Sequence, residues 1–252
     1  MKAPIYEPSG KAKEYGDLAL NIYTGCTHGC YYCFAPNVLH KTKEAFSNDV
    51  MPRAGIVEEV RKQLEKEKIT GKTIHLCFTC DPYPSGIDTS VTREIIKLLK
   101  DSGNHVQILT KSGEQSVVRD FDLLDENDWF GITYAGYPQG TLFTHQESEP
   151  NADPVVERLA ALAIAHKRGI KTWMSIEPVL DDVDVLNFLT LNPYYVDRYK
   201  IGKLNYHPSS INWKVFGRRA ESICKSEKMD YYIKESLRNE MNRDDPQEVN
   251  HE

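Results

Sequence analysis

Apolar and polar residues along the chain repeat with two different periods, which predict strands and helices in alternation. Short apolar runs indicate buried strands, and apolar residues that recur every three or four positions indicate amphipathic helices. The predicted strands are Leu18–Ile22, Thr73–Phe78, Val106–Thr110, Trp129–Tyr134, Ile170–Ile176 and Tyr194–Ile201. The predicted helices, caps included, are Gly55–Lys68, Thr89–Gly103, Glu114–Leu124, Pro154–Gly169, Val183–Leu191 and Trp213–Ser226, before a short strand and a last helix around Glu235–Met241.

Six alternations of strand and helix favour an α/β fold with a parallel sheet, because the connections are too long for hairpins. Six units predict a partial barrel, and an open doubly wound sheet is the alternative. In both architectures the residues that follow the strands meet at one rim. We expect an N-terminal segment at 1–17, the barrel at 18–205 and a helical C-terminal extension, packed on the barrel, at 206–252.

The composition is that of a soluble globular protein, with 40% hydrophobic and 27% charged residues among 252. No apolar run is long enough to span a membrane, and the polar start from Met1 to Asp17 has no apolar signal core. We therefore expect a cytoplasmic protein. Thiols stay reduced in that compartment, so the six cysteines indicate metal or redox chemistry rather than disulfides.

The charge is uneven, although the net value of -6 argues against an indiscriminate polyanion binder. Residues 198–243 hold eleven Lys/Arg against five Asp/Glu, whereas residues 1–197 hold twenty against twenty-eight. This basic segment predicts a nucleic-acid face, and a set of solvated helix faces is the alternative. The side chains expected at phosphates are Lys200, Lys203, Arg218, Arg219 and Lys234, and those expected to stack on a base are Tyr194, Tyr195, Tyr206, Trp213, Tyr231 and Tyr232.

Three cysteines, Cys26, Cys30 and Cys33, fall within eight residues of one loop. Three thiolates this close repel one another, so such loops usually hold metal. Gly25 and Gly29 would let the backbone turn and approach the sulfurs. A zinc ion would need a fourth ligand from His28, His40 or a distant cysteine. Three thiolates without an obvious fourth favour an iron–sulfur site with one open metal position, and zinc is the alternative.

At Cys26, Cys30, Tyr32 and Cys33 the sequence resembles the radical S-adenosylmethionine (radical SAM) enzymes, whose signature is Cys-x3-Cys-x-aromatic-Cys. The resemblance implies a partial (β/α)6 barrel of the radical SAM type and a [4Fe-4S] cluster on these three cysteines. The fourth iron would be chelated by S-adenosylmethionine, whose reductive cleavage releases a 5′-deoxyadenosyl radical that takes a hydrogen atom from the substrate. Tyr32 would lie near the adenine.

Further motifs resemble the group related to spore photoproduct lyase and the DNA repair photolyases. They include Asn21-x-Tyr-x-Gly-Cys, Thr79-x-Asp-Pro-Tyr, Thr110-Lys-Ser, Glu149-Pro and Arg158-Leu. The resemblance implies that Lys111 contacts the carboxylate of S-adenosylmethionine, that Thr133 lies near its ribose or methionyl group, and that Phe34 and Asp81 belong to the cofactor site. Glu149 and Arg158 would pair or hold the cofactor. The alternative for this pair is an exposed ion pair worth under about 1 kcal/mol.

The lyases have a hydrogen-donating cysteine near the end of their second strand, where this chain has Cys77 and Cys80. Cys80 is the better candidate, because a residue beyond the strand end can reach the pocket. The spacing also allows a redox dithiol or a metal site.

These features together predict a radical SAM enzyme that repairs or modifies a nucleic-acid base, most readily a pyrimidine in DNA. A radical enzyme acting on a peptide or small metabolite is one alternative, and a non-catalytic iron–sulfur or zinc protein is another. The expected partners are DNA or another nucleic acid and an electron donor such as flavodoxin or ferredoxin. We expect a monomer.

Overall fold

The strands form a single sheet in a computed structural model that describes residues 3–137 and 147–243. The sheet has eight strands, and their order in space follows the chain from β1 to β8. β1 is antiparallel to β2, and every later pair is parallel. The strands are β1 (Ile5–Tyr6), β2 (Leu18–Leu20), β3 (Thr73–Leu76), β4 (His105–Thr110), β5 (Trp129–Thr133), β6 (Lys171–Ile176), β7 (Arg198–Ile201) and β8 (Tyr231–Ile233).

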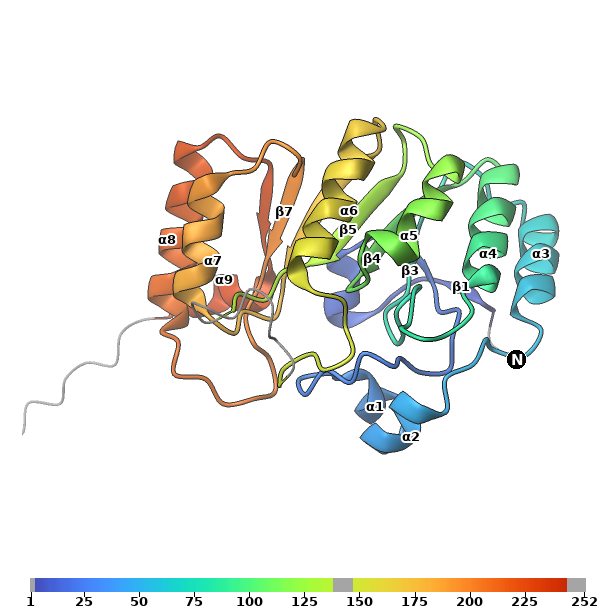
Figure 1. Ribbon diagram of the computed structural model, residues 1–252, viewed down its shortest axis with the longest axis horizontal. Helices are drawn as coiled ribbons and strands as arrows, with labels where there is room; N and C mark the ends of the chain where they lie inside the picture. Colours follow the sequence, from blue (N-terminus) through green and yellow to red (C-terminus); the bar gives the residue numbers. More distant parts are fainter. Residues whose placement is uncertain (1–2, 138–146, 244–252) are drawn as a thin grey trace, which may run out of the picture.

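Each parallel strand is followed by helical structure, and the helices stand in a row on one side of the sheet (Figure 1). The helices after the strands are α3 (Ile56–Glu67), α4 (Ser90–Asp101), α5 (Glu114–Val117) with η2 (Val118–Leu123), α6 (Val155–Lys167), α7 (Asp182–Leu191), α8 (Trp213–Ser226) and α9 (Glu235–Met241). The short elements η1 (Gly10–Glu14), α1 (Ala35–Val38) and α2 (Lys43–Asn48) lie before β2 and between β2 and α3. None of the described helices has the length and apolar character that a membrane crossing needs.

The predicted α/β fold with an unclosed, mostly parallel sheet is confirmed, with three differences in detail. The strand expected from Tyr194 begins at Arg198, because residues 193–196 form a turn in which the Val196 amide donates to the Pro193 carbonyl. β8 pairs with β7, so the sheet has seven parallel strands rather than six. β1, η1, α1 and α2 were not predicted.

The two faces of the sheet differ in polarity. One set of alternate residues packs under the helices as the apolar core and includes Ile74, Ile108, Ile132 and Ile176. The other set faces inward and holds polar and bulky side chains, among them His75, Gln107, Trp173 and Lys200. Strand pairing puts these inward residues in adjacent rows, so they line the inside of the curved sheet.

Tyr15 fills this interior. Its ring centroid lies 5.4 Å from that of His75 and 5.8 Å from that of Trp173. The Lys200 ammonium lies 4.8 Å from the Tyr15 ring centroid and donates to the Glu14 carbonyl at 2.8 Å, and Lys234 pairs with Glu177 and donates to the Tyr15 hydroxyl at 3.0 Å.

The prediction that Lys200 and Lys234 contact phosphates is therefore wrong. Only 8% of Lys200 and 2% of Lys234 is exposed. Both ammonium groups are occupied by carbonyl, carboxylate and aromatic partners inside the barrel, where a polyanion cannot reach them.

The N-terminal segment also joins the two ends of the sheet. It leaves the β1–β2 edge and contacts the loop that follows β7 through Lys11, whose ammonium donates to Asn205 at 2.7 Å. Glu14 accepts from the Tyr232 hydroxyl at 3.1 Å and from the Glu235 amide at 2.7 Å. Residues 10–15 thus close the side of the barrel that strand pairing leaves open.

Replacing Gly131 by alanine should destabilise the protein by about 1–3 kcal/mol, because the inner face has no room there. An added Cβ would lie 2.2 Å from Nε1 of Trp173, whose indole is fixed by its hydrogen bond to the Ile108 carbonyl at 3.0 Å. Urea denaturation measures the loss. Gly16→Ala is the matched control, since a Cβ at Gly16 meets nothing within 4 Å. Equal stability of the two variants would contradict this packing of the interior.

Candidate functional site

The loop with the three cysteines follows β2 and is tied to its surroundings mainly by backbone hydrogen bonds. The Cys26 amide donates to the Phe46 carbonyl in α2 at 3.2 Å. A Cβ on Gly25 would lie 2.0 Å from the same oxygen, and Gly29 has a φ of +70°. Gly29 thus has the turn expected of it, and Gly25 allows a close approach to the Phe46 carbonyl. The expected approach of the backbone to the sulfurs stays a prediction.

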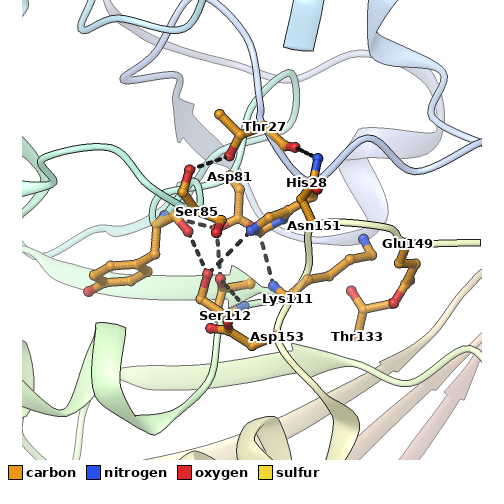
Figure 2. A network of polar contacts seen from close by, with 12 residues as sticks. Thr27, His28, Asp81, Ser85, Lys111, Ser112, Thr133, Glu149, Asn151 and Asp153 are labelled. Carbon is orange, nitrogen blue, oxygen red and sulfur yellow. Dashed lines mark hydrogen bonds and ion pairs between the residues drawn. The ribbon is translucent and has the colours of Figure 1, made fainter. Parts of the chain in front are cut away.

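A segment far along the chain holds the other side of this loop (Figure 2). The Asn151 amide donates to the His28 carbonyl at 3.1 Å, and its side chain donates to the Thr27 carbonyl at 2.9 Å. The Tyr31 amide donates to the Ser148 carbonyl at 3.1 Å. The cysteine loop is therefore clamped between α2 and residues 148–151.

The three cysteine side chains are close enough to interact electrostatically but do not converge on one point. Burial raises the pKa of all three thiols, that of Cys30 to about 12, so without a cation they would stay protonated at neutral pH. Among the described residues, these three sulfurs do not all lie within 4.8 Å of one another. Ligands of one tetrahedral zinc would be about 3.8 Å apart, given Zn–S bonds of about 2.3 Å. The described positions of the three sulfurs therefore do not already match a single zinc site.

Asp81 connects this loop to the ends of β3 and β4 (Figure 2). Its carboxylate accepts from the Thr110 hydroxyl at 2.6 Å, the Tyr83 amide at 2.8 Å and the Lys111 amide at 3.1 Å. Nδ1 of His28 lies 3.4 Å from the same carboxylate. All of these partners are protein groups, so Asp81 positions the cysteine loop and the backbone of Lys111 and has little capacity left for a ligand.

Lys111 extends from the end of β4 toward the cysteines. Within the described part of the chain its ammonium has no hydrogen-bond or ion-pair partner, and it lies 5.6 Å from the centroid of the Tyr32 ring. Burial lowers the pKa of Lys111, but the negative charges of Cys30 and Glu149 outweigh burial and raise it above its ordinary value. A half-buried cation that has no hydrogen-bond or ion-pair partner among the described residues suits an anionic ligand beside the cysteines.

Glu149 and Arg158 form a fully buried ion pair, with 0% of either side chain exposed and 2.6 Å between Nη2 and Oε2. The alternative of an exposed pair is therefore wrong. Glu149 also accepts from the hydroxyls of Tyr32 and, at 2.9 Å, Tyr137. Arg158 donates to the carbonyls of Asp153 at 2.8 Å and Thr133 at 3.2 Å.

The ionised state of Glu149 is strongly favoured in this pair. Burial raises the pKa of its carboxyl, but the charges of Arg158 and Lys111 and the hydrogen bonds from Tyr32 and Arg158 lower it to about 2. The folded-state pKa lies below the ordinary value of 4.5. The pair therefore stabilises the fold at neutral pH, and this contribution declines as the pH falls from 4.5 toward 2.

The structure brings together most of the predicted site residues, whereas Phe34 is largely exposed beside Cys33 and Cys80 lies apart. Tyr32, Asp81, Lys111, Thr133, Glu149 and Arg158 surround the space beside Cys26, Cys30 and Cys33. Phe34 precedes α1 and is 46% exposed. Cys80 accepts a hydrogen bond from the Tyr23 amide at 3.4 Å, on the side of β2, and its described contacts include none of the site residues.

Sequence reasoning missed the residues that orient the predicted ones. Tyr137 bonds Glu149, Asn151 holds the cysteine loop, and Asp153 accepts from the Gly113 amide at 2.6 Å, next to the β4 end. Their contacts join segments that are distant in sequence. The only local signal was the Glu149-Pro150-Asn151 run itself, which marks a turn rich in side-chain acceptors.

Comparisons with known proteins place the chain in a family. The sequence model of the radical SAM superfamily matches residues 20–184. The uncharacterized protein ORF301 of Acidianus two-tailed virus is 30% identical over 202 residues, which cover 71% of this chain and 64% of that protein. The uncharacterized protein MJ0683 of Methanocaldococcus jannaschii is 29% identical over 167 residues, covering 65% of this chain and 61% of that protein. The chain thus spans under two thirds of either relative.

Solved structures show the same fold at low sequence identity. A spore photoproduct lyase mutant superposes with a TM-score of 0.68 at 12% identity, covering 90% of this chain and 78% of that one. A lyase double mutant with bound S-adenosylmethionine and dinucleoside spore photoproduct has a TM-score of 0.62 at 15% identity, with coverages of 88% and 65%. Streptococcus suis SuiB bound to its precursor peptide has a TM-score of 0.59 at 12% identity, with coverages of 88% and 51%.

The loop of three cysteines after the first parallel strand, the unclosed α/β sheet and the match over residues 20–184 agree with one another. The family uses a [4Fe-4S] cluster and S-adenosylmethionine as cofactors. This chain belongs to the radical SAM superfamily.

Proposed function

We propose that the protein binds a [4Fe-4S] cluster through Cys26, Cys30 and Cys33 and reductively cleaves S-adenosylmethionine. The observation that carries the proposal is the Lys111 ammonium beside these cysteines, which has no hydrogen-bond or ion-pair partner among residues 3–137 and 147–243 and suits the carboxylate of a cofactor chelated at the open iron. When bound, the cluster and S-adenosylmethionine supply a 5′-deoxyadenosyl radical. A one-electron donor such as flavodoxin or ferredoxin would provide the electron.

The other residues of the site position this chemistry. Tyr32 would contact the adenine, and its hydroxyl is fixed by Glu149. Thr133 stays a predicted contact of the ribose or methionyl group, and its carbonyl is held by Arg158. The charges of Glu149 and Arg158 neutralise each other. We therefore propose that the pair supports Tyr32 and Thr133 and does not bind the cofactor directly. Phe34, being exposed, would contact the cofactor only at the rim of the site.

For the substrate we propose a nucleic-acid base. The support is the likeness of fold to lyase structures, one of which holds a dinucleoside photoproduct. Tyr206, which follows β7, is 76% exposed, as a side chain that stacks on an extruded base must be. Tyr194 lies before β7, beside His166 at the end of α6, and so at the opposite rim of the sheet.

Arg218 and Arg219, both exposed on α8, remain from the basic segment as phosphate contacts. Lys203 pairs with Glu240, and only 19% of its side chain is exposed, so we no longer assign it to a phosphate. Cys80 stays the predicted hydrogen donor to the substrate radical.

The second candidate substrate is a peptide. SuiB has the same fold and was solved with its precursor peptide. The burial of Lys200 and Lys234 favours this candidate, because it removes two of the five cations assigned to phosphates. The two substrates differ in how binding depends on salt.

Anaerobically purified protein should contain iron and sulfide and, once reduced with dithionite, should form 5′-deoxyadenosine from S-adenosylmethionine. Cys30→Ala should lose iron and this activity, because no other described thiol can replace that ligand. Cys224→Ala, in the buried face of α8, is the control and should keep its iron. Metal analysis that finds zinc without iron would contradict the proposal.

Lys111→Ala should weaken binding of S-adenosylmethionine by about tenfold or more, because a charge-assisted contact is worth about 1.5–3 kcal/mol. Its iron content should be unchanged, since the ammonium holds no part of the cysteine loop among the described residues. Equilibrium binding and iron analysis measure the two effects. Lys62→Ala, on the exposed face of α3, should change neither. Loss of iron from Lys111→Ala would show that the ammonium supports the loop instead.

Binding to single-stranded and duplex oligonucleotides should weaken with salt. Each phosphate contact contributes about -0.9 to the log–log slope on duplex DNA, so the two remaining cations, Arg218 and Arg219, allow a slope of about -2 at most. Arg219→Ala should make the slope shallower by about 0.9, and Lys62→Ala should leave it unchanged. Absence of binding at low salt, or binding without a slope, would favour the peptide.

A further inference from the structure

Cys77 and Cys80 form a second thiol site on the β2 side of the barrel, away from the loop with Cys26, Cys30 and Cys33. β3 ends at Leu76, so both cysteines lie in the turn that follows it. The predicted strand ended later, at Phe78. The amides of Phe78, its last residue, and of Thr79, the residue after it, donate instead to the Asn21 side-chain oxygen, both at 2.8 Å.

The hydrogen bonds to the Asn21 side chain hold this turn in a fixed shape. One side-chain oxygen accepts from two successive amides, and the Asn21 amide group donates to the Tyr6 hydroxyl at 2.7 Å. Cys77 has a φ of 152°, a backbone conformation that is uncommon for a residue with a Cβ. The turn thus brings the two side chains close enough for their thiols to interact with each other.

The two thiols have different surroundings. Cys77 is buried, with 6% exposed, and burial raises the pKa of its thiol well above the ordinary value. Cys80 is half-buried, and burial alone would raise its pKa too. Hydrogen bonds from Cys77 and from the Tyr23 and Ile22 amides, together with the charge of Arg53, outweigh burial and lower the pKa of Cys80.

We infer that Cys77 and Cys80 are a redox dithiol that exchanges electrons with disulfides, Cys80 being the attacking thiol and Cys77 the resolving one. The inference rests on the paired sulfurs, the turn held by Asn21 and the greater exposure of Cys80. It goes beyond the proposed function and does not require the cluster or S-adenosylmethionine. The partner is identified by chemistry as a small or protein disulfide.

The exchange is balanced in atoms and electrons. The Cys80 thiolate attacks one sulfur of the disulfide RSSR, the S–S bond breaks, and one RS⁻ leaves. Cys77 then loses its proton and attacks the Cys80 sulfur of the mixed disulfide, which forms the Cys77–Cys80 bond and releases the second RS⁻. The two protons of the dithiol leave with the two thiols, so RSSR is reduced to 2 RSH.

The pair also bears on the predicted hydrogen donor. Cys80 carries a hydrogen atom to donate only while the pair is reduced, because the disulfide has no S–H bond. Exchange with the thiol pool would therefore restore the donor after any oxidation of the pair.

The test uses the full chain, loaded with its cluster under anaerobic conditions and equilibrated with glutathione and glutathione disulfide in varied ratios. After blocking of free thiols, trypsin places Cys77 and Cys80 together on peptide 73–93, the three loop cysteines on 14–41 and Cys224 on 220–225. Mass spectrometry then reads each site separately. Peptide 73–93 should become lighter by two hydrogens as the glutathione disulfide fraction rises, while Cys224 stays unmodified.

Two variants assign the roles. Cys77→Ser should accumulate one glutathione on Cys80, because the resolving thiol is absent. Cys80→Ser should acquire glutathione on Cys77 at least about tenfold more slowly, because that thiol is buried and protonated. The inference is overturned if peptide 73–93 of the unaltered protein stays reduced at the highest disulfide fraction. Faster modification of Cys77 than of Cys80 would also overturn it.

Discussion

The buried ion pair of Glu149 and Arg158 is the interaction on which the arrangement of the site depends. Moving two charges out of water costs several kcal/mol for each ion, so such a pair is stable only when its donors and acceptors are matched. Here the matching is extensive. Arg158 donates to Glu149 and to the carbonyls of Thr133 and Asp153, and Glu149 accepts from Tyr32 and Tyr137. The pair therefore fixes α6, the end of β5, the 149–153 segment and the cysteine loop relative to one another.

Much of the fold was predictable because its elements follow local hydrophobic periods. The helix at Ile56–Glu67 and the strand at His105–Thr110 appear within one or two residues of their predicted bounds. The errors have a common cause in tertiary contacts. The apolar residues Tyr194 and Tyr195 resemble a strand, but Pro193 begins a turn there. Lys200 appeared to be a surface cation, yet the carbonyls of Glu14 and Tyr15 hold it inside the barrel, and nothing near Lys200 in sequence indicates this.

The parts of the site likewise differ in whether local sequence or tertiary contacts determine them. The three cysteines were predictable because they all lie in one short loop. The same loop contains Gly29 and Tyr32, so these residues could be recognised with the cysteines. Asp81 was predicted as a cofactor contact, but the structure uses its carboxylate to join the ends of β3 and β4 to His28. Its role depends on which strands are neighbours, and the order of strands in space is not written in any local motif. Tyr137 and Asn151 were missed for the same reason.

The closure of the barrel by residues 10–15 bears on how the chain is made. The hydrogen bond from the Tyr232 hydroxyl to Glu14 spans 218 positions, and that from the Glu235 amide spans 221. Contacts of such long sequence separation form late in folding, because ordering the intervening chain costs entropy first. On a ribosome, which releases the N-terminus first, Tyr15 has to wait for Lys234 to emerge before its hydroxyl gains that partner. Nascent chains that end before Lys234 therefore have an open barrel, and water still hydrates its polar interior.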